Sequence, residues 1–254
     1  PFFRYADSAG IGPESDFVPP ALDTSASQAS LRRNYVLGQD AYGAISDLNL
    51  KGAVIPVPDL AVGRLVETPD QIMGMIDAYL GLTDGVLPTP TSSLVTGYDF
   101  LTSAADSVQA DFAAGLGPTG TADTLITDQG IPTTTTTSGT PSRDRSWTAA
   151  DLSTALLGSR HDLIFLAGHF SANDALAADY QTSLATSDLD AHPNLLTNSL
   201  VISAGCHSGY NLLDADGVPG LTNGLDWPEV MARQRATFIG GTGYQYADTD
   251  FLAY

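Results

Sequence analysis

Two side chains that can carry out covalent chemistry stand at matching places after two apolar runs. Residues 163–167 form one run and Gly168-His169 follows it, whereas residues 200–204 form the other and Gly205-Cys206 follows that one. Continuous apolar runs of this length are typical of central parallel strands. Because groups beyond the carboxyl ends of neighbouring parallel strands share one crevice, the sequence predicts that Cys206 and His169 lie close together.

A thiol beside an imidazole is sufficient for nucleophilic catalysis. The thiolate attacks, and the imidazole takes the thiol proton or stabilises the thiolate as an ion pair. Gly205 and Gly209 allow a sharp turn that exposes Sγ, and the backbone N–H groups of Cys206 and Phe170 are candidates for binding an oxyanion. Cys206 is the only cysteine, so it makes no intrachain disulfide. The alternative to a nucleophile is a buried core thiol.

The elements that must position this pair alternate between strand and helix along the chain. This order predicts an α/β fold in which helices cover both faces of a sheet. Strands are expected at residues 53–57, 61–66, 93–96 and 124–127, and helices after the capping boxes at Thr68 and Thr148 and over 105–116. Residues 1–50 are expected to form loops around short strands. Residues 129–146, which include a threonine run, are expected to form a flexible loop within a single domain, 1–254.

Composition limits the partners of the chain. Its 254 residues are 43% hydrophobic, and 29 acidic against 10 basic residues give a formal net charge of −19. Such a charge repels phosphate backbones and anionic lipid, so nucleic acid is excluded as a partner. No stretch reaches the roughly 20 apolar residues of a membrane span. The composition is typical of a secreted or cell-surface bacterial protein.

Five segments, in a fixed order, resemble the motifs of one enzyme family. They are Asp40-Ala41-Tyr42-Gly43 (D-x-x-Y-G in the family), residues 58–65 (P-D-I-x-V-G-R-[LIF]), Gly168-His169 (G-H-G), Ser203-Ala204-Gly205-Cys206 (a strand ending in A-x-C) and residues 227–243 (a helix, then A-V-A-x-I-G-S-T-G). On these motifs the chain resembles the gingipain family of clan CD cysteine peptidases, which share their fold with caspases. The resemblance implies a three-layer α/β/α caspase-like sandwich with a mostly parallel sheet. It also implies that the first part of the sheet, before Pro1, is missing and is supplied by another chain of the same precursor or has been removed.

The resemblance also assigns roles to residues outside the dyad. Asp99 matches the acid that orients the catalytic histidine, and Asp106 lies near the aspartate that binds arginine in the S1 pocket. A polypeptide substrate with Arg or Lys at P1 is therefore implied, because a carboxylate pairs well with guanidinium. Tyr244 and Tyr246 would form the aromatic wall of that pocket. The alternative for both aspartates is ordinary capping at a helix start.

Two residues beside the predicted pair keep other functions open. Phe170 replaces the glycine that usually follows the histidine and narrows the approach to substrate, so a catalytically inactive surface or assembly module with Phe170 blocking the cleft is one alternative. His207 directly follows Cys206, as in PfpI-type amidotransferase-like hydrolases, where such a histidine would act in place of His169. The ordered matches favour His169, and His207 is then expected at the solvated rim of the site.

The sequence contains one weak metal motif. Asp214-Ala215-Asp216-Gly217 resembles the opening of a calcium loop, but the distant glutamate of an EF-hand is absent. The gingipain resemblance implies structural calcium, with Asp214 and Asp216 as candidate ligands. The four histidines and one cysteine show no zinc-ligand spacing, and Cys–His chemistry itself requires no cofactor.

Overall fold

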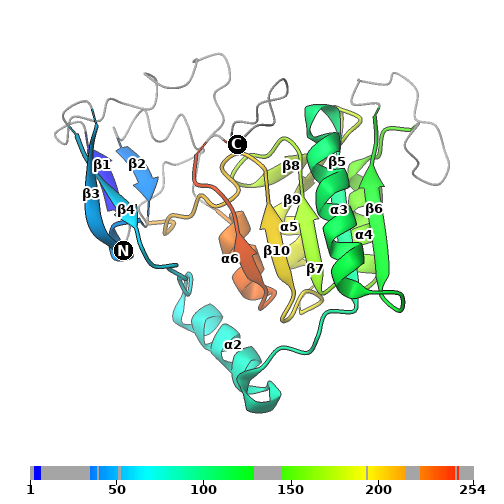
Figure 1. Ribbon diagram of the computed structural model, residues 1–254, viewed down its shortest axis with the longest axis horizontal. Coiled ribbons are helices and arrows are strands. Elements are labelled where there is room, and N and C mark those ends of the chain that lie inside the picture. The colour runs from blue at the N-terminus through cyan, green and yellow to red at the C-terminus, as the bar shows by residue number, and fades with distance from the viewer. Residues whose placement is uncertain are drawn as a thin grey trace.

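A computed structural model describes residues 3–6, 35–38, 40–50, 53–128, 145–192, 194–215, 224–243 and 245. Its central feature is a five-stranded sheet with the order β11-β10-β7-β5-β6, in which every neighbouring pair is parallel (Figure 1). The strands are β5 (Ser92–Gly97), β6 (Thr121–Ile126), β7 (Leu163–Leu166), β10 (Leu200–Ser203) and β11 (Thr237–Ile239). The predicted α/β class with a mostly parallel sheet is confirmed.

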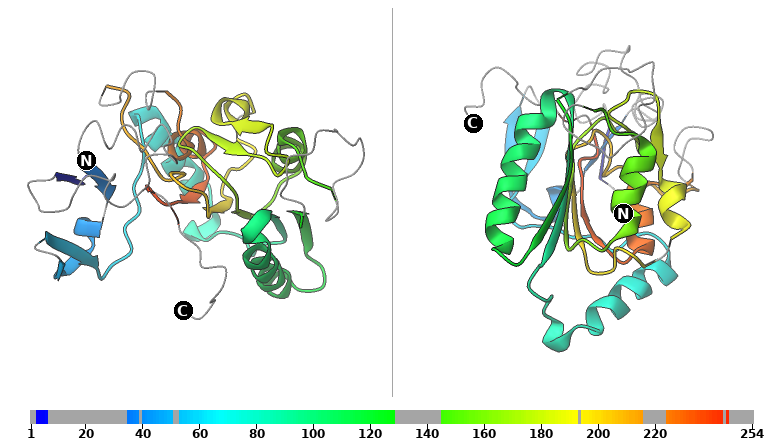
Figure 2. Two further views of the ribbon diagram at one scale, coloured as in Figure 1. Left: turned by 90° about the horizontal axis from the view of Figure 1, so that it is seen from above. Right: turned by 90° about the vertical axis from the view of Figure 1, so that its right-hand side faces the viewer.

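Helices cover both faces of this sheet, which gives three layers (Figure 2). On one face α3 (Thr102–Leu116) packs through Ala105 on Val95 and Ile126. The other face carries α4 (Ala149–Gly158), α5 (Thr186–Asp190) and α6 (Trp227–Arg233). Successive strand residues point to opposite faces of the sheet. The strand residues that alternate with Val95 and Ile126 therefore point to this second face and form its core. Its fully buried members include Leu94, Ile164, Val201 and Trp227.

Local sequence signals start and end the helices. The predicted capping boxes are present at Thr68–Gln71, before α2 (Pro69–Leu80), and at Thr148–Asp151, before α4. Helix α3 begins at Thr102, earlier than the expected start at residue 105, and ends at Gly117, whose φ of 72° favours glycine. The predicted strand at residues 61–66 is wrong. This segment is neither strand nor helix, and it pairs with no described strand.

The remaining described elements are short. Three antiparallel pairs lie outside the main sheet: β1 (Phe3–Ala6) with β2 (Tyr35–Gly38), β3 (Ala44–Leu50) with β4 (Ala53–Pro58), and β8 (Asp174–Leu176) with β9 (Ser183–Ala185). Short 3-10 helices cover Asp40–Tyr42, Thr83–Gly85 and Asp99–Leu101. Most of the predicted 129–146 loop lies outside the described residues. No helix in the described part of the chain is long and apolar enough to cross a membrane.

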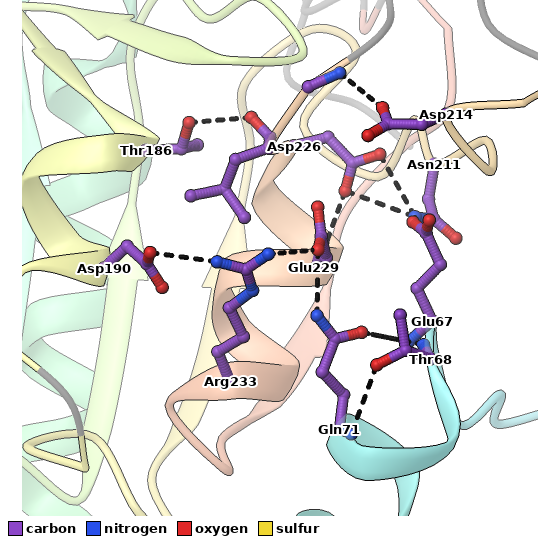
Figure 3. A network of polar contacts seen from close by, with 12 residues as sticks. Glu67, Thr68, Gln71, Thr186, Asp190, Asn211, Asp214, Asp226, Glu229 and Arg233 are labelled. Carbon is purple, nitrogen blue, oxygen red and sulfur yellow. Dashed lines mark hydrogen bonds and ion pairs between the residues drawn. The ribbon is translucent and has the colours of Figure 1, made fainter.

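A buried polar network joins α2 to α6 (Figure 3). Asn211 Nδ2 donates to Glu67 Oε2 at 3.0 Å and to the two oxygens of Asp226 at 3.2 and 3.1 Å. Asp226 caps α6 by accepting from the Glu229 N–H at 2.9 Å. Glu229 in turn accepts from Gln71 of α2 at 2.8 Å. Three carboxyl groups therefore share one largely buried region, where neighbouring negative charges repel each other.

The Asp226→Asn substitution is expected to change how stability depends on pH. Burial is the main cause that raises the pKa of Asp226 to about 8, and the nearby charges of Glu67 and Glu229 contribute to this rise. The folded state thus retains a proton that the unfolded state releases above about pH 4, so the unfolding free energy falls between about pH 4 and about pH 8, by up to about 1.4 kcal/mol per pH unit. Asparagine stays neutral and can still cap α6. The substitution should therefore raise the unfolding free energy at pH 8 and reduce its decrease between about pH 4 and about pH 8.

Urea unfolding at pH 5.5 and pH 8 measures this effect. Asp190→Asn is the matched control, because Asp190 also lies in the network, as a partner of Arg233 at 2.9 Å, but its side chain is 37% exposed. The control should keep the wild-type pH dependence. A wild-type protein that is equally stable at both pH values would contradict the expectation.

Candidate active site

Three neighbouring strands end in register at the carboxyl edge of the sheet. Thr96 of β5 pairs with Leu166 of β7, and Leu166 pairs with Ser203 of β10. Asp99, His169 and Cys206 each follow their paired residue at the same interval along the chain. Because the strands are parallel, the three residues leave the sheet at one level and in the spatial order Asp99, His169, Cys206.

The His169 ring is held through its Nε2 atom. Nε2 lies 3.3 Å from the hydroxyl oxygen of Tyr180, and that hydroxyl donates to Asp99 Oδ2 at 2.5 Å. Nε2 and Asp99 Oδ2 themselves are 3.6 Å apart, which is too long for a good hydrogen bond. Tyr180 therefore bridges the imidazole and the carboxylate. Nδ1 has no hydrogen-bond partner among the described residues.

Backbone strain accompanies this arrangement. Asp99 and Tyr180 both have left-handed backbone angles, with φ of 58° and 55°. Such angles are uncommon for residues other than glycine and are often found at functional sites. The bridge between the two side chains joins the start of a 3-10 turn after β5 to the loop between β8 and β9.

Aromatic rings enclose the other sides of His169. The backbone N–H of His169 donates to the hydroxyl of Tyr98 at 3.0 Å, and this hydroxyl donates to the Leu176 carbonyl at 2.7 Å. Burial raises the pKa of Tyr98, which keeps the phenol neutral. The rings of Tyr98 and Phe100 contact the imidazole edge to face, at centroid distances of 5.6 and 5.8 Å. The imidazole is therefore fixed in orientation, while its side chain stays 40% exposed.

The Cys206 thiol is half-buried and contacts the segment after β11. The Gln245 N–H donates to Sγ at 3.4 Å, and Sγ lies 3.7 Å from the Gln245 carbonyl oxygen. The same loop is tied down by the His207 N–H, which donates to the Gly243 carbonyl at 2.9 Å, and by the Gly209 N–H, which donates to the Gly241 carbonyl at 2.8 Å. Within the described residues no hydrogen bond joins the thiol to His169.

Phe170 points into the core and not into the cleft. Its side chain is 8% exposed and packs against Trp227, with ring centroids 5.3 Å apart. A Cβ atom on Gly205 would overlap the Phe170 ring, so glycine is required beside the nucleophile position. The hypothesis that Phe170 blocks the cleft is therefore wrong. The ring is drawn inward because an exposed phenylalanine would lose the apolar burial that Trp227 provides.

His207 is buried, which corrects the expectation of a solvated rim residue. Its side chain is 1% exposed, and Nδ1 lies 3.2 Å from the Thr242 carbonyl oxygen. Burial lowers the pKa of His207. The left-handed φ of 57° also falls on His207 and not on Cys206, whereas a nucleophile elbow places the strained turn at the nucleophile itself.

Comparison with known proteins gives one structural likeness. The described fold is similar to that of the Arg-specific cysteine proteinase gingipain R. The TM-score is 0.47 and the sequence identity 16%, and the alignment covers 74% of this chain and 41% of the gingipain R chain. This chain therefore spans less than half of the length of that proteinase. No family model and no curated protein matches the sequence.

The other predicted site residues are described only in part. Asp106 lies half-buried on α3, and Asp214 Oδ1 accepts from the Gly224 N–H at 2.5 Å. Tyr244, Tyr246 and Asp216 lie outside the described residues. In the described part of the chain, no three His, Cys, Asp or Glu side chains are grouped so that they could hold a metal ion.

Sequence reasoning missed three residues that contact His169, namely Tyr98, Phe100 and Tyr180. Tyr98 directly precedes Asp99, and its position at a strand end was the one available signal for it. Tyr180 lies in the loop between β8 and β9 and reaches the site only through the folding of that loop. No spacing in the sequence connects Tyr180 to His169.

Proposed function

We propose that this chain is a cysteine endopeptidase domain in which Cys206 is the nucleophile and His169 the general base. The observation that carries the proposal is the register of three strand ends, which brings an acid, an imidazole and a thiol to one edge of the sheet. Nε2 of His169 is engaged by Tyr180, so Nδ1 is the nitrogen that serves the thiol. A gingipain-like, clan CD mechanism is consistent with this order of groups.

The reaction follows from these positions. His169 Nδ1 takes the thiol proton, and Sγ attacks the carbonyl carbon of the scissile peptide bond. The backbone N–H groups of Cys206 and Phe170 bind the oxyanion. Phe170 and Ala175 form a non-hydrogen-bonded antiparallel pair, so the Phe170 N–H points away from Ala175 and is available for this role. His169 then returns the proton to the leaving amine as the C–N bond breaks. Water hydrolyses the resulting thioester with His169 again as the base.

Tyr180 and Asp99 act as positioning residues in this proposal. With the imidazole proton on Nε2, the Tyr180 oxygen accepts it while the Tyr180 hydroxyl donates to Asp99. The carboxylate thus fixes the hydroxyl, and the hydroxyl fixes the tautomer that leaves Nδ1 unprotonated. The arrangement also stabilises the imidazolium that forms when Nδ1 takes the thiol proton.

Tyr180→Phe is expected to lower kcat by about 10-fold, because Nε2 loses its hydrogen-bond acceptor. Asp99→Asn should have a similar effect through the same contact. The kcat of the double variant should lie within about twofold of the kcat of the slower single variant, because both substitutions break the same chain of hydrogen bonds. Steady-state kinetics on one peptide substrate measure all three. Fully multiplicative losses would show that the two side chains act separately.

A basic P1 residue is the specificity that we propose, with Asp106 as the S1 carboxylate. Peptides that differ only at P1 (Arg, Lys, Leu or Asp) test both the activity and its preference. We expect cleavage after Arg and Lys, and a smaller Arg preference in Asp106→Asn. No cleavage of any peptide, while iodoacetamide still alkylates Cys206, would replace the enzyme proposal with an inactive surface or assembly module.

We propose two further properties of this chain, a structural calcium site and an exported location. Structural calcium would involve Asp214 and Asp216, and calcium titration followed by thermal unfolding tests it. An exported location agrees with the composition.

A further inference from the structure

Phe100 presents a phenyl ring at the candidate active site. It lies in the 3-10 turn Asp99–Leu101, and the side chains of Tyr98 and Leu101 on either side of it are buried. Phe100 itself is 42% exposed. The turn is held in place because the Leu101 N–H donates to the Tyr98 carbonyl at 3.1 Å and the Thr102 hydroxyl donates to the Asp99 carbonyl at 3.1 Å. A fixed backbone therefore keeps this ring at the surface of the site.

The Phe100 ring reaches His169 from the side opposite to the strand of Cys206. The strand order places β7, which leads to His169, between β10, which leads to Cys206, and β5, which leads to Phe100. The rings of Phe100 and His169 contact each other edge to face at a centroid distance of 5.8 Å. Of the aromatic residues that contact His169, Tyr98 is fully buried and Tyr180 is partly buried. Phe100 is the one that offers most surface to a bound molecule.

The proposed mechanism indicates where the leaving half of a substrate lies. The acyl half stays on Cys206, and His169 gives its proton to the leaving amine, so this amine lies beside the imidazole. The substrate chain after the scissile bond therefore runs from the β10 side toward the β5 side, across His169. The side chain of its first residue, P1′, starts on the carbon atom next to that amine. It is within reach of a ring whose centroid is 5.8 Å from that of the imidazole.

The surroundings of Phe100 favour one class of P1′ side chain. An apolar side chain that covers an exposed phenyl ring removes apolar surface of both groups from water, and an aromatic one adds an edge-to-face contact. The Asp99 carboxylate, whose side chain is 41% exposed, lies beside the same ring in the sequence. It repels an acidic side chain at this position.

We propose that Phe100 is a specificity-determining residue that forms the S1′ subsite and selects a large apolar side chain, aromatic before aliphatic, directly after the scissile bond. The inference rests on the proposed peptidase function and adds the leaving-group side of the substrate to it. It is independent of the P1 preference assigned to Asp106, because P1 lies on the acyl half.

Acyl transfer measures the S1′ subsite separately from the rest of the reaction. A peptide ester with the preferred P1 residue acylates Cys206, and either water or an added amino acid amide then takes the acyl group from the thioester. The amine of the added amide attacks the thioester carbon and its surplus proton goes to His169. The C–S bond breaks, and His169 returns the proton to the thiolate. The ratio of the amide product to the acid product reports how well the added residue occupies S1′.

The wild type should transfer the acyl group to phenylalaninamide about 3- to 10-fold better than to alaninamide. It should use aspartic acid α-amide less well than asparagine amide. Phe100→Ala should bring phenylalaninamide and alaninamide to within about twofold of each other, and Phe100→Leu should keep part of the difference. A Phe100 ring that only holds the imidazole would affect transfer and hydrolysis alike, so an unchanged preference in Phe100→Ala would overturn the inference.

Tyr79→Ala is the matched control. Tyr79 is also an exposed aromatic residue, at 58%, but it lies near the end of α2, away from the carboxyl ends of the strands (Figure 1). This variant should keep the wild-type preference. A wild type that hydrolyses the ester but uses phenylalaninamide and alaninamide equally would overturn the inference alone. Failure to hydrolyse any ester or peptide would overturn the proposed function, and the inference with it.

Discussion

Cys206→Ala is expected to abolish peptide hydrolysis, with kcat reduced by about 10⁴-fold or more. The thiol is the group that forms the covalent bond, and the chain has no second cysteine that could replace it. The measurement is hydrolysis of the preferred peptide under saturating conditions. Residual activity above about 1% of wild type would mean that another residue is the nucleophile.

The loss should come from chemistry and not from unfolding. Cys206 is half-buried and its hydrogen bonds run to the main chain of Gln245, so Cys206→Ala should change the unfolding free energy by no more than about 1 kcal/mol. Gly205→Ala provides the contrast. A Cβ atom there overlaps the Phe170 ring, and this overpacking should destabilise the fold by about 1–3 kcal/mol. Urea unfolding of both variants separates the two effects.

His169→Ala is the second large expected effect, with kcat reduced by about 10³-fold. Without the imidazole no group in the site takes the thiol proton or returns it to the leaving amine. The fold should persist, because the His169 side chain is 40% exposed and the Tyr98 hydroxyl still accepts from the backbone N–H of residue 169. Steady-state kinetics at pH 7 give the result.

His192→Ala is the matched control for this variant. His192 is an exposed histidine after α5 and should be replaceable without change in kcat. His207→Ala addresses the rival hydrolase mechanism. Because His207 is buried against Thr242, its loss should lower stability more than the chemical rate. Activity that survives His169→Ala but not His207→Ala would favour the rival.

The parts of the fold that could be predicted are those encoded locally. Apolar runs specified β7 and β10, because only a strand covered on both faces tolerates such runs, and the boxes at Thr68 and Thr148 specified the starts of α2 and α4. Parallel register then followed from topology and brought His169 and Cys206 to one edge. The segment 61–66 has the apolar composition of a strand, but a strand also needs a partner edge, which local sequence does not supply.

The details of the site depend on contacts between residues far apart in the chain. Phe170 turns inward because Trp227 offers it a partner, and His207 is buried because the segment after β11 folds over it. Tyr180 reaches Asp99 from a loop whose path is set by β8 and β9. None of these contacts has a periodic or motif signal, so each required the folded structure.

The most direct test of the Cys206–His169 pair is the rate at which a peptidyl acyloxymethyl ketone with arginine at P1 labels Cys206. Intact-protein and peptide mass spectrometry follow the label in the wild type, His169→Ala and His207→Ala, with iodoacetamide as a reagent that reports only thiol accessibility. The proposed mechanism predicts labelling of the wild type and of His207→Ala, at least a 100-fold slower rate in His169→Ala, and a much smaller change with iodoacetamide. Equal labelling of Cys206 in the wild type and in His169→Ala would contradict the proposed pair.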